Sequence, residues 1–156
     1  VYTTTSTSNL EWVTELGADK VIDYKTEDYK AIVKDADIVF DTLGKNYTTE
    51  AFAVVKKGGM VVSVAGPLDE ENAKMFGMAD YKLPTELSNL VSEKEAAYKF
   101  IFMHPNGSHL DEIKALVEDD KIKPIIDKVY PFSESIEAFI HLTSGRAKGK
   151  IVIKIA

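Results

Sequence analysis

The sequence predicts an α/β fold built on a doubly wound parallel sheet, and two observations carry this prediction. Over the first 67 residues, short β-branched segments alternate with segments whose apolar residues recur at helical spacing, which is the pattern of βαβ units. Two of the segments, 37–44 and 60–66, are nearly continuous apolar runs, which is typical of parallel strands buried on both faces. At 156 residues, the chain has the length of one domain.

The start of the chain predicts two strand–helix pairs. Residues 1–6 are β-branched and aromatic, which favours a strand, and Ser8 or Asn9 is placed to cap the helix that follows. A second short strand is expected at 20–24, and Thr26 should cap the next helix.

The middle of the chain continues the alternation. After the strand at 37–44, a helix should run through Val55 and end at Gly58, before the strand at 60–66. Residues 68–97 are highly charged, and we expect one or two helices and a connecting loop there. This segment should be a peripheral cover.

The last third predicts a strand at 98–103, a helix at 108–119, an extended segment at 125–132, a helix capped by Ser133, and a basic turn with a final strand at 145–155. We expect the apolar side of the helix after Ser133 to face inward. Its residues are Ile136, Phe139, Ile140 and Leu142.

Composition argues against several classes of function. The net charge is −6, with acids and bases mixed along the chain, so attraction to nucleic acid or to an anionic membrane is not expected. The chain has no cysteine, and its three histidines match no metal-ligand spacing, so no metal site is predicted in it. It shows no run of about 18 apolar residues and no signal peptide. We therefore expect a soluble, cytoplasmic protein.

Candidate ligand contacts lie where strands end, because ligands of doubly wound sheets bind at the carboxyl ends of the strands. The residues at these ends are Thr5, Ser6, Tyr24, Thr42, Leu43, Gly44, Val64, Ala65 and Gly66. The two glycines would let a flat ligand approach the backbone closely. The alternative for each glycine is that it only breaks the strand before its helix.

The end of the first strand indicates which dinucleotide would bind. An acid at this position accepts hydrogen bonds from the adenosine ribose of NAD, but here the sequence reads TTTSTSN, with no acid before Glu11. Hydroxyl groups and the N–H groups of a helix N-terminus can donate hydrogen bonds to a 2′-phosphate, which favours NADP over NAD. The alternative is that threonine is simply common in strands and serine at helix caps. No catalytic residue is predicted, because no nucleophile motif and no phosphate-binding loop is present.

Four stretches together resemble the medium-chain dehydrogenase/reductase family, in its quinone oxidoreductase (zeta-crystallin-like) branch. They are LGADKVIDYKTED, DIVFDTLG, VVKKGGMVVSVAG and SIEAFIHLTSGRAKGKIVIKI, in the family's order and spacing. The resemblance implies a Rossmann-like sheet that lacks its usual first strand and glycine turn. It further implies an incomplete dinucleotide-binding domain over 1–144, and a turn and strand at 145–156 that would join an N-terminal catalytic domain.

The resemblance also implies roles for individual residues. Tyr24 matches the tyrosine that packs on the NADP 2′-phosphate, and Arg146 is the best match for a C-terminal basic contact. Residues 42–44 would lie beneath the cofactor and 64–66 near the nicotinamide, and Phe102 and Met103 match the end of the next strand. Asn9 stands where some relatives have a lysine for the 2′-phosphate, a departure that weakens the NADP preference without reversing it.

The function implied is the NADP(H)-binding portion of an NADPH-dependent, zinc-independent oxidoreductase that reduces quinones or enone-type carbonyl compounds. A homodimer through the edge of the strand at 98–103 is expected. The alternative is a non-catalytic nucleotide-binding or dimerisation module. Without the usual first strand, two strand edges would be unpaired, and we expect either residues 150–155 or a partner chain to fill the gap.

Overall fold

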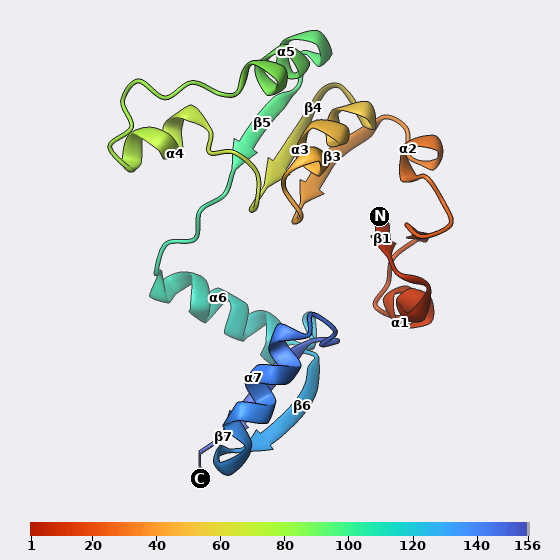
Figure 1. Cartoon of the computed structure of the whole chain (residues 1–156), viewed down its shortest axis with the longest axis vertical. Helices are drawn as coiled ribbons and strands as arrows, with labels where there is room; N and C mark the ends of the chain where they lie inside the picture. The colour runs from red at the N-terminus through yellow and green to blue at the C-terminus, as the bar shows by residue number, and fades with distance from the viewer. Residues whose placement is uncertain (156) are drawn as a thin grey trace. The chain divides into compact units, whose positions relative to one another are not determined.

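The computed structural model describes residues 1–155 and divides the chain into two compact units, Val1–Met103 and a unit that begins at His104 (Figure 1). The first unit contains β1 (Tyr2–Thr5), η1 (Thr7–Asn9), α1 (Leu10–Glu15), β2 (Lys20–Asp23), α2 (Tyr29–Ile32), β3 (Ala36–Asp41), α3 (Asn46–Glu50), η2 (Ala51–Ala53), β4 (Val55–Ser63), α4 (Glu70–Met75), α5 (Thr85–Lys94) and β5 (Ala97–Phe100). The second contains α6 (Gly107–Glu118), β6 (Ile126–Pro131), η3 (Phe132–Glu134), α7 (Ser135–Thr143) and β7 (Lys150–Lys154).

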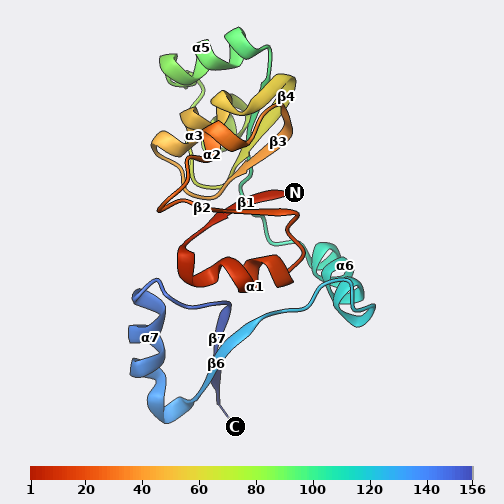
Figure 2. The ribbon, with the colours of Figure 1, turned by 90° about the vertical axis from the view of Figure 1, so that its right-hand side faces the viewer.

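The strand pairing confirms the predicted α/β class. In the first unit β1 pairs with β2, and a separate sheet has the order β3-β4-β5. Every strand pair in residues 1–155 is parallel, and each is linked by a crossover that contains a helix. Figure 2 shows β1 and β2 side by side, with α1 running along them. This is a doubly wound arrangement in which β1 and β3 are both edge strands.

Two apolar clusters hold the first unit together. The larger one contains Phe52, Val61 and Leu87, which come from η2, β4 and α5. The smaller one, which contains Ile22 and Val54, connects β2 to the segment before β4. Full burial of each such side chain contributes about 1.5–3 kcal/mol to folding. The clusters fix the positions of β2, β3 and β4, and therefore of the loops at their ends.

The expectation that the strand at 37–44 is buried on both faces is wrong. Ile38 is 65% exposed and Phe40 is 61% exposed. The reason is that β3 is an edge strand, and the described part of the first unit leaves one of its faces open. The apolar run is real, but within residues 1–155 it is only half covered.

The predicted helix through Val55 to Gly58 is also wrong, because β4 already begins at Val55. The helical part of this segment ends with η2. A Cβ atom at Gly59 would lie 2.7 Å from the Val55 side chain and 2.9 Å from the Asp37 carbonyl oxygen. Gly59 therefore lies inside a strand because the backbone of β3 approaches it closely, at the irregularity in the β3–β4 pairing.

Two predicted helix caps are corrected by the structure. The side chain of Asp28, rather than that of Thr26, caps α2 and accepts from the Lys30 N–H at 3.0 Å. Before α1, the side chain of Asn9 makes no cap hydrogen bond. Asn9 is the last residue of the 3₁₀ helix η1, which leads directly into α1.

In the second unit, β7 pairs with β6 along its length. The imidazole of His141 links α7 to β6, because its Nδ1 lies 3.1 Å from the Tyr130 hydroxyl and its Nε2 lies 3.2 Å from Asp127. α7 begins at Ser135 with Glu134 at its N-cap, so Ser133 is not the cap. The apolar side of α7 is exposed rather than turned inward, with Ile136 at 73%. No helix in residues 1–155 is long and apolar enough to cross a membrane.

Candidate functional site

A buried aspartate holds the turn after β3. Asp41, the last residue of the strand, is 6% exposed. Its Oδ1 accepts hydrogen bonds from the backbone N–H groups of Leu43 and Gly44, both at 2.9 Å, and its Oδ2 accepts one from the Thr48 hydroxyl at 2.6 Å. The carboxylate therefore ties the predicted site residues 42–44 to α3.

A buried serine holds the turn after β4 in the same way. The Ser63 hydroxyl donates to Asp41 Oδ2 at 2.9 Å, and its oxygen accepts from the N–H groups of Ala65 and Gly66 at 3.2 and 2.8 Å. Each polar group in this network has a partner, as buried polar groups require. Asp41 and Ser63 thus join the turns at 42–44 and 64–66 into one hydrogen-bonded network at the ends of adjacent parallel strands.

Both predicted site glycines are required by the packing of these two turns. Gly44 has φ +68°, and a Cβ atom there would lie 2.1 Å from the backbone oxygen of Ala65. A Cβ at Gly66 would lie 2.7–2.9 Å from the hydroxyl oxygens of Thr48, Tyr98 and Ser63. The two turns are in direct contact. Their packing explains why glycine is needed at both positions, without any contribution from a ligand.

The Asp41 carboxylate stays charged within this network. Burial raises the pKa of Asp41, but the hydrogen bonds from Thr48, Gly44, Leu43 and Ser63 outweigh it and hold the pKa below its usual value. The site consequently contains a negative charge at neutral pH, and that charge is surrounded by donors rather than open to solvent.

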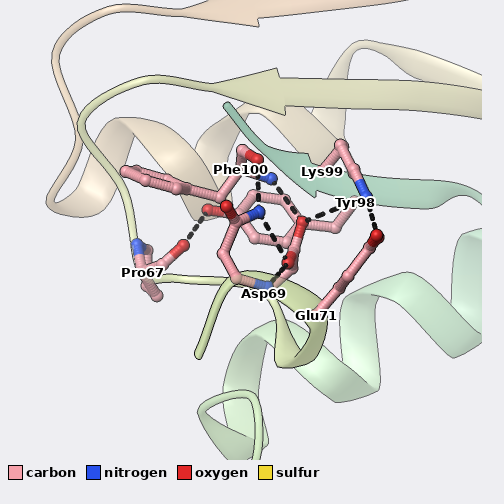
Figure 3. Close-up of polar contacts among 7 residues, drawn as sticks. Pro67, Asp69, Glu71, Tyr98, Lys99 and Phe100 are labelled. Atoms are coloured by element: carbon pink, nitrogen blue, oxygen red, sulfur yellow. Dashed lines mark hydrogen bonds and ion pairs between the residues drawn. The ribbon is translucent and has the colours of Figure 1, made fainter. Parts of the chain in front are cut away.

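A second polar cluster anchors the loop beyond Gly66 (Figure 3). The Tyr98 hydroxyl donates to the Pro67 carbonyl at 2.6 Å, and Asp69 accepts from the Phe100 N–H at 2.9 Å. Asp69 also caps α4 and lies 3.9 Å from the Lys99 ammonium group, which forms a second ion pair with Glu71. Burial raises the pKa of Tyr98 to about 12, so its hydroxyl remains a donor. The cluster fixes the path of the chain after β4.

The ends of β1 and β2 also meet. The Tyr24 N–H donates to the Thr5 carbonyl at 3.1 Å. The Thr7 hydroxyl donates to Asp23 at 2.5 Å, and the Lys25 N–H donates to the other oxygen of this carboxylate at 3.0 Å. The hydrogen bond from Thr7 is the main reason why the pKa of Asp23 is lowered. A buried carboxylate therefore lies beside the end of β1, although no acid is near it in the sequence.

The polar residues that follow β1 are only partly satisfied by the protein. The hydroxyl groups of Ser6 and Ser8 lie 3.2 Å apart. In residues 1–155, the Oδ1 of Asn9 is a buried atom without a hydrogen-bond partner. An unpaired buried amide is costly, and a ligand group is one way to satisfy it.

The remaining predicted site residues, Phe102, Met103 and Arg146, lie outside the turns at the ends of β3 and β4. β5 ends at Phe100, so Phe102 and Met103 follow the strand instead of ending it. The ring of Phe102 makes an edge-to-face contact with Phe76, with ring centroids 5.0 Å apart. Arg146 belongs to the second unit, where its N–H donates to the Ser144 hydroxyl at 3.2 Å.

Three predicted residues, Tyr24, Thr42 and Leu43, line one cavity of about 740 Å³. The cavity is also lined by β1, by β3 and by the buried residues Val33, Ala51 and Val54. The structure thus brings together the predicted residues at the ends of β2 and β3 at one end of an apolar groove.

Sequence reasoning missed the residues that position the turns, namely Asp41, Ser63, Thr48 and Tyr98. The signal available was a polar residue at the end of each apolar strand, followed three residues later by glycine. This is a spacing at which a side-chain oxygen can accept from the turn N–H groups. Among residues 1–155, no three His, Asp or Glu side chains are grouped as metal ligands.

The comparisons with known proteins agree with this geometry. Residues 16–153 match the model of the family described as zinc-binding dehydrogenase. The chain is 36% identical over 157 aligned residues to the mitochondrial NAD(P)H oxidoreductase RTN4IP1 of Bos taurus, which covers 93% of the chain and 39% of the relative. It is 30% identical over 155 residues to the chloroplastic NADPH-dependent alkenal/one oxidoreductase of Arabidopsis thaliana, which covers 98% of the chain and 33% of the relative.

A solved structure shows the same fold. The quinone oxidoreductase of Coxiella burnetii superposes with a TM-score of 0.77 at 24% identity over 100% of the chain and 45% of its own length. The chain therefore spans less than half of the length of the relatives it matches. The family match over most of the sequence, with this fold, confirms the resemblance to the medium-chain dehydrogenase/reductases: the chain belongs to the zinc-binding dehydrogenase family.

Proposed function

We propose that this chain is the NADP(H)-binding portion of an NADPH-dependent, zinc-independent oxidoreductase that reduces quinones or enone-type carbonyl compounds. The observation that carries the proposal is the hydrogen-bonded pair of turns at the ends of β3 and β4. Dinucleotides bind at the carboxyl ends of parallel strands, and Asp41 and Ser63 hold both ends in fixed positions. Rigid support of this kind is what a cofactor platform needs.

The residues at these ends fit the chemistry of the cofactor. Leu43 and Val64 are exposed and offer an apolar surface to its flat rings, and Tyr24 is exposed beside the end of β1. When bound, the nicotinamide would supply the hydride. The role of this chain's residues is to bind and orient the dinucleotide, with Phe102, Met103 and Arg146 as further proposed contacts.

The surroundings of β1 support NADP over NAD. Asp23 is buried, and its two oxygens already accept from Thr7 and Lys25, so it is not placed as the acid that binds ribose hydroxyls. Ser6 and the side-chain amide of Asn9 can instead donate to a 2′-phosphate, since rotation of the amide exchanges its unpaired Oδ1 with its NH₂ group. Lys25 adds a positive charge next to Tyr24.

The proposed substrate class is supported by the relatives named above, one of which is described as an NADPH-dependent alkenal/one oxidoreductase. A homodimer through the free edge of β5 and a cytoplasmic location belong to the same proposal. So does the division into a dinucleotide domain at 1–144 and a joining segment at 145–156. The alternative function, a nucleotide-binding or dimerisation module without catalysis, shares the cofactor contacts and differs only in turnover.

Cofactor titration tests the proposal. NADPH and NADH fluorescence should be titrated with the 156-residue chain, and the same titration repeated with Tyr24→Ala and Asn9→Asp variants. We expect tighter binding of NADPH than of NADH, and a loss of this preference in Asn9→Asp, because an added carboxylate repels the 2′-phosphate. A preference for NADH in the unaltered chain, or no binding of either cofactor, would contradict the proposal. Oxidation of bound NADPH by 1,4-benzoquinone or by an alkenal then separates an enzyme from a binding module.

A further inference from the structure

The residue directly before α6, the first helix of the second unit, is Asn106 (Figure 1). The chain contains five asparagines, and Asn106 is the one that glycine follows; the others precede leucine, tyrosine or alanine. Asn106, Gly107 and Ser108 are exposed to solvent. Because glycine has no Cβ, its backbone nitrogen can approach a neighbouring side chain more closely than that of any other residue. This exposed Asn-Gly pair is therefore the place in the chain where a side-chain amide can react most readily with the backbone.

The side chain of Asn106 caps α6. Its Oδ1 accepts hydrogen bonds from the Ser108 N–H at 3.0 Å, from the Ser108 hydroxyl at 2.6 Å and from the His109 N–H at 3.4 Å. The cap thus satisfies two of the N–H groups that a helix leaves unpaired at its start. Three hydrogen bonds from one turn hold the amide in a single orientation.

In this orientation the Asn106 amide is protected from the Gly107 nitrogen. The ψ angle of Asn106 is 109°. For an L-residue, this angle turns the following nitrogen away from Cβ and places the carbonyl oxygen on the Cβ side. A ring between the side chain and the Gly107 nitrogen can close only when that nitrogen and Cβ lie on the same side of the Cα–C bond. The ψ angle must therefore rotate, and this rotation carries the first turn of α6 away from Oδ1, so the cap must open first.

The fold does not require glycine at position 107. A Cβ atom at Gly107 would meet nothing within 4 Å, and Gly107 is not among the glycines with positive φ. Alanine is also the better helix former. Gly107→Ala should therefore leave α6 folded and change only the access of the backbone nitrogen to the side chain.

We propose that Asn106 is a deamidation site whose reaction is controlled by the cap of α6. When the cap opens, the Gly107 nitrogen bonds to Cγ of Asn106 and gives up its proton. The Cγ–Nδ2 bond breaks, and Nδ2 leaves with that proton as ammonia, so that a cyclic imide remains. Water then opens the imide at one of its two carbonyl carbons, which yields aspartate or isoaspartate. Neither step transfers electrons to or from an outside group.

The two products have opposite effects on α6. Aspartate keeps an oxygen that accepts from Ser108 and His109, and it adds a negative charge beside a first turn that has no acidic residue. In isoaspartate the backbone runs through the former side chain, so the backbone gains one methylene group and the acceptor oxygen is displaced. The cap cannot then form again. Isoaspartate formation thereby converts a transient opening of the cap into a permanent one.

Timed incubation of the 156-residue chain tests the proposal. Samples held at neutral pH and physiological temperature are digested under mildly acidic conditions, and the peptides are analysed by mass spectrometry. We expect the mass gain that replacement of an amide by a carboxyl group produces, confined to the peptide that contains Asn106, with aspartate and isoaspartate both present. Asn89 is the internal control, because it is also exposed but precedes Leu90 within α5.

Three variants separate the chemistry from the cap. Gly107→Ala should slow the reaction about tenfold or more, because its Cβ obstructs the approach of the nitrogen. Ser108→Ala removes the hydroxyl donor and should speed the reaction about three- to tenfold, since the loss of one hydrogen bond makes the cap open more often. Ser108→Thr is the matched control, because it keeps a hydroxyl group and should react at the rate of the unaltered chain.

Three results would overturn the proposal: no mass gain at Asn106 in the Ser108→Ala variant, an equal gain at Asn89, or equal rates for Ser108→Ala and Ser108→Thr. If circular dichroism shows that a variant is unfolded, amide exchange in the unaltered chain replaces the comparison of rates. The Ser108 and His109 amides must then lose protection as isoaspartate accumulates, and unchanged protection contradicts the proposal. The measurement uses no nucleotide, so its outcome is independent of cofactor binding.

Discussion

The two edges of β3 differ sharply. Towards β4, the strand is paired along its length and ends in Asp41, whose carboxylate and carbonyl oxygens accept from four other residues and from Val64. Towards β1, the backbone of Ile38 and Phe40 faces a groove, and both side chains are exposed. One edge is hydrogen-bonded within the chain along its length, whereas the other has no strand partner among residues 1–155.

This contrast shows which backbone groups of β3 find their hydrogen-bond partners within the chain and which do not. The two turns at 42–44 and 64–66 are positioned by groups of the chain, so their geometry does not require a ligand. The open edge has the opposite character, because its polar backbone groups have no strand partner among residues 1–155. Substitutions on the β4 side of β3 should therefore lower the free energy of unfolding strongly, whereas substitutions on the groove side should change it little.

The largest expected effect is that of Gly44→Ala on the β4 side. The added Cβ would meet the backbone oxygen of Ala65 at 2.1 Å, and φ at this position is +68°. Strain and overpacking together should lower the free energy of unfolding by about 3 kcal/mol or more. Gly77→Ala is the matched control, because φ is +77° there but nothing lies within 4 Å of the added atom. It should lose only about 1–2 kcal/mol in urea unfolding, and equal losses for the two variants would show that the turns do not pack as described.

Asp41→Asn should have the next largest effect. Asparagine has one acceptor oxygen, so it cannot accept from the two hydroxyl groups and from the two backbone N–H groups at once, and a buried donor loses its partner at a cost of about 1–3 kcal/mol. The folded pKa of Asp41 is lowered, so its contribution is fully present above the unfolded pKa of about 3.9 and is lost as pH falls through the folded value. The difference in stability between the two proteins should therefore shrink below pH 4. A difference that is constant from pH 7 to pH 3 would contradict this.

Tyr98→Phe should have a smaller effect. It removes the hydrogen bond to the Pro67 carbonyl, which anchors the loop after Gly66. We expect a loss of about 1 kcal/mol in the free energy of unfolding, measured by urea titration. Tyr81→Phe is the control, because Tyr81 lies in the segment between α4 and α5, outside the two turns. A loss as small as that of the control would mean that the loop is held by Asp69 alone.

The smallest effect is expected on the groove side. Phe40→Thr introduces a β-branched residue, which strands favour, at a position that is 61% exposed, so the stability of the chain should change by no more than about 0.5 kcal/mol. Phe52→Ala, in the core, should by contrast lose about 3–5 kcal/mol. Thermal unfolding of both variants makes the comparison. A large loss for Phe40→Thr would show that this face is covered in the chain itself.

The sequence predicted the positions of most strands better than it predicted which of their faces are buried. The alternation of apolar strands and helices places β1, β2, β3 and β5 near their observed positions, because parallel strands require crossover helices. It could not show that β3 has an open side, since an apolar run looks the same whether one or both faces are covered. It also misplaced the start of β4, where the apolar Val54 and Val55 fit a helix and a strand equally well.

The sequence indicated which strand ends lie together, but not which side chains hold them in place. Residues 42–44 and 64–66 do meet, as expected for the ends of adjacent parallel strands. The hydrogen bond between Asp41 and Ser63 joins residues that are 22 positions apart in the sequence. The pairing of β3 with β4 brings them together, and a local sequence pattern does not reveal such a contact. For the same reason, the carboxylate of Asp23 beside the end of β1 could not be anticipated from the residues that follow that strand.

Amide hydrogen exchange along β3 in the unliganded chain tests the contrast most directly. The N–H groups of Val39 and Asp41 face β4, and those of Ile38 and Phe40 face the groove. We predict slow exchange for Val39 and Asp41, with protection that approaches the global stability, and fast exchange for Ile38 and Phe40. Equal protection of all four amides would contradict the account, because it would mean that the groove edge of β3 is already paired.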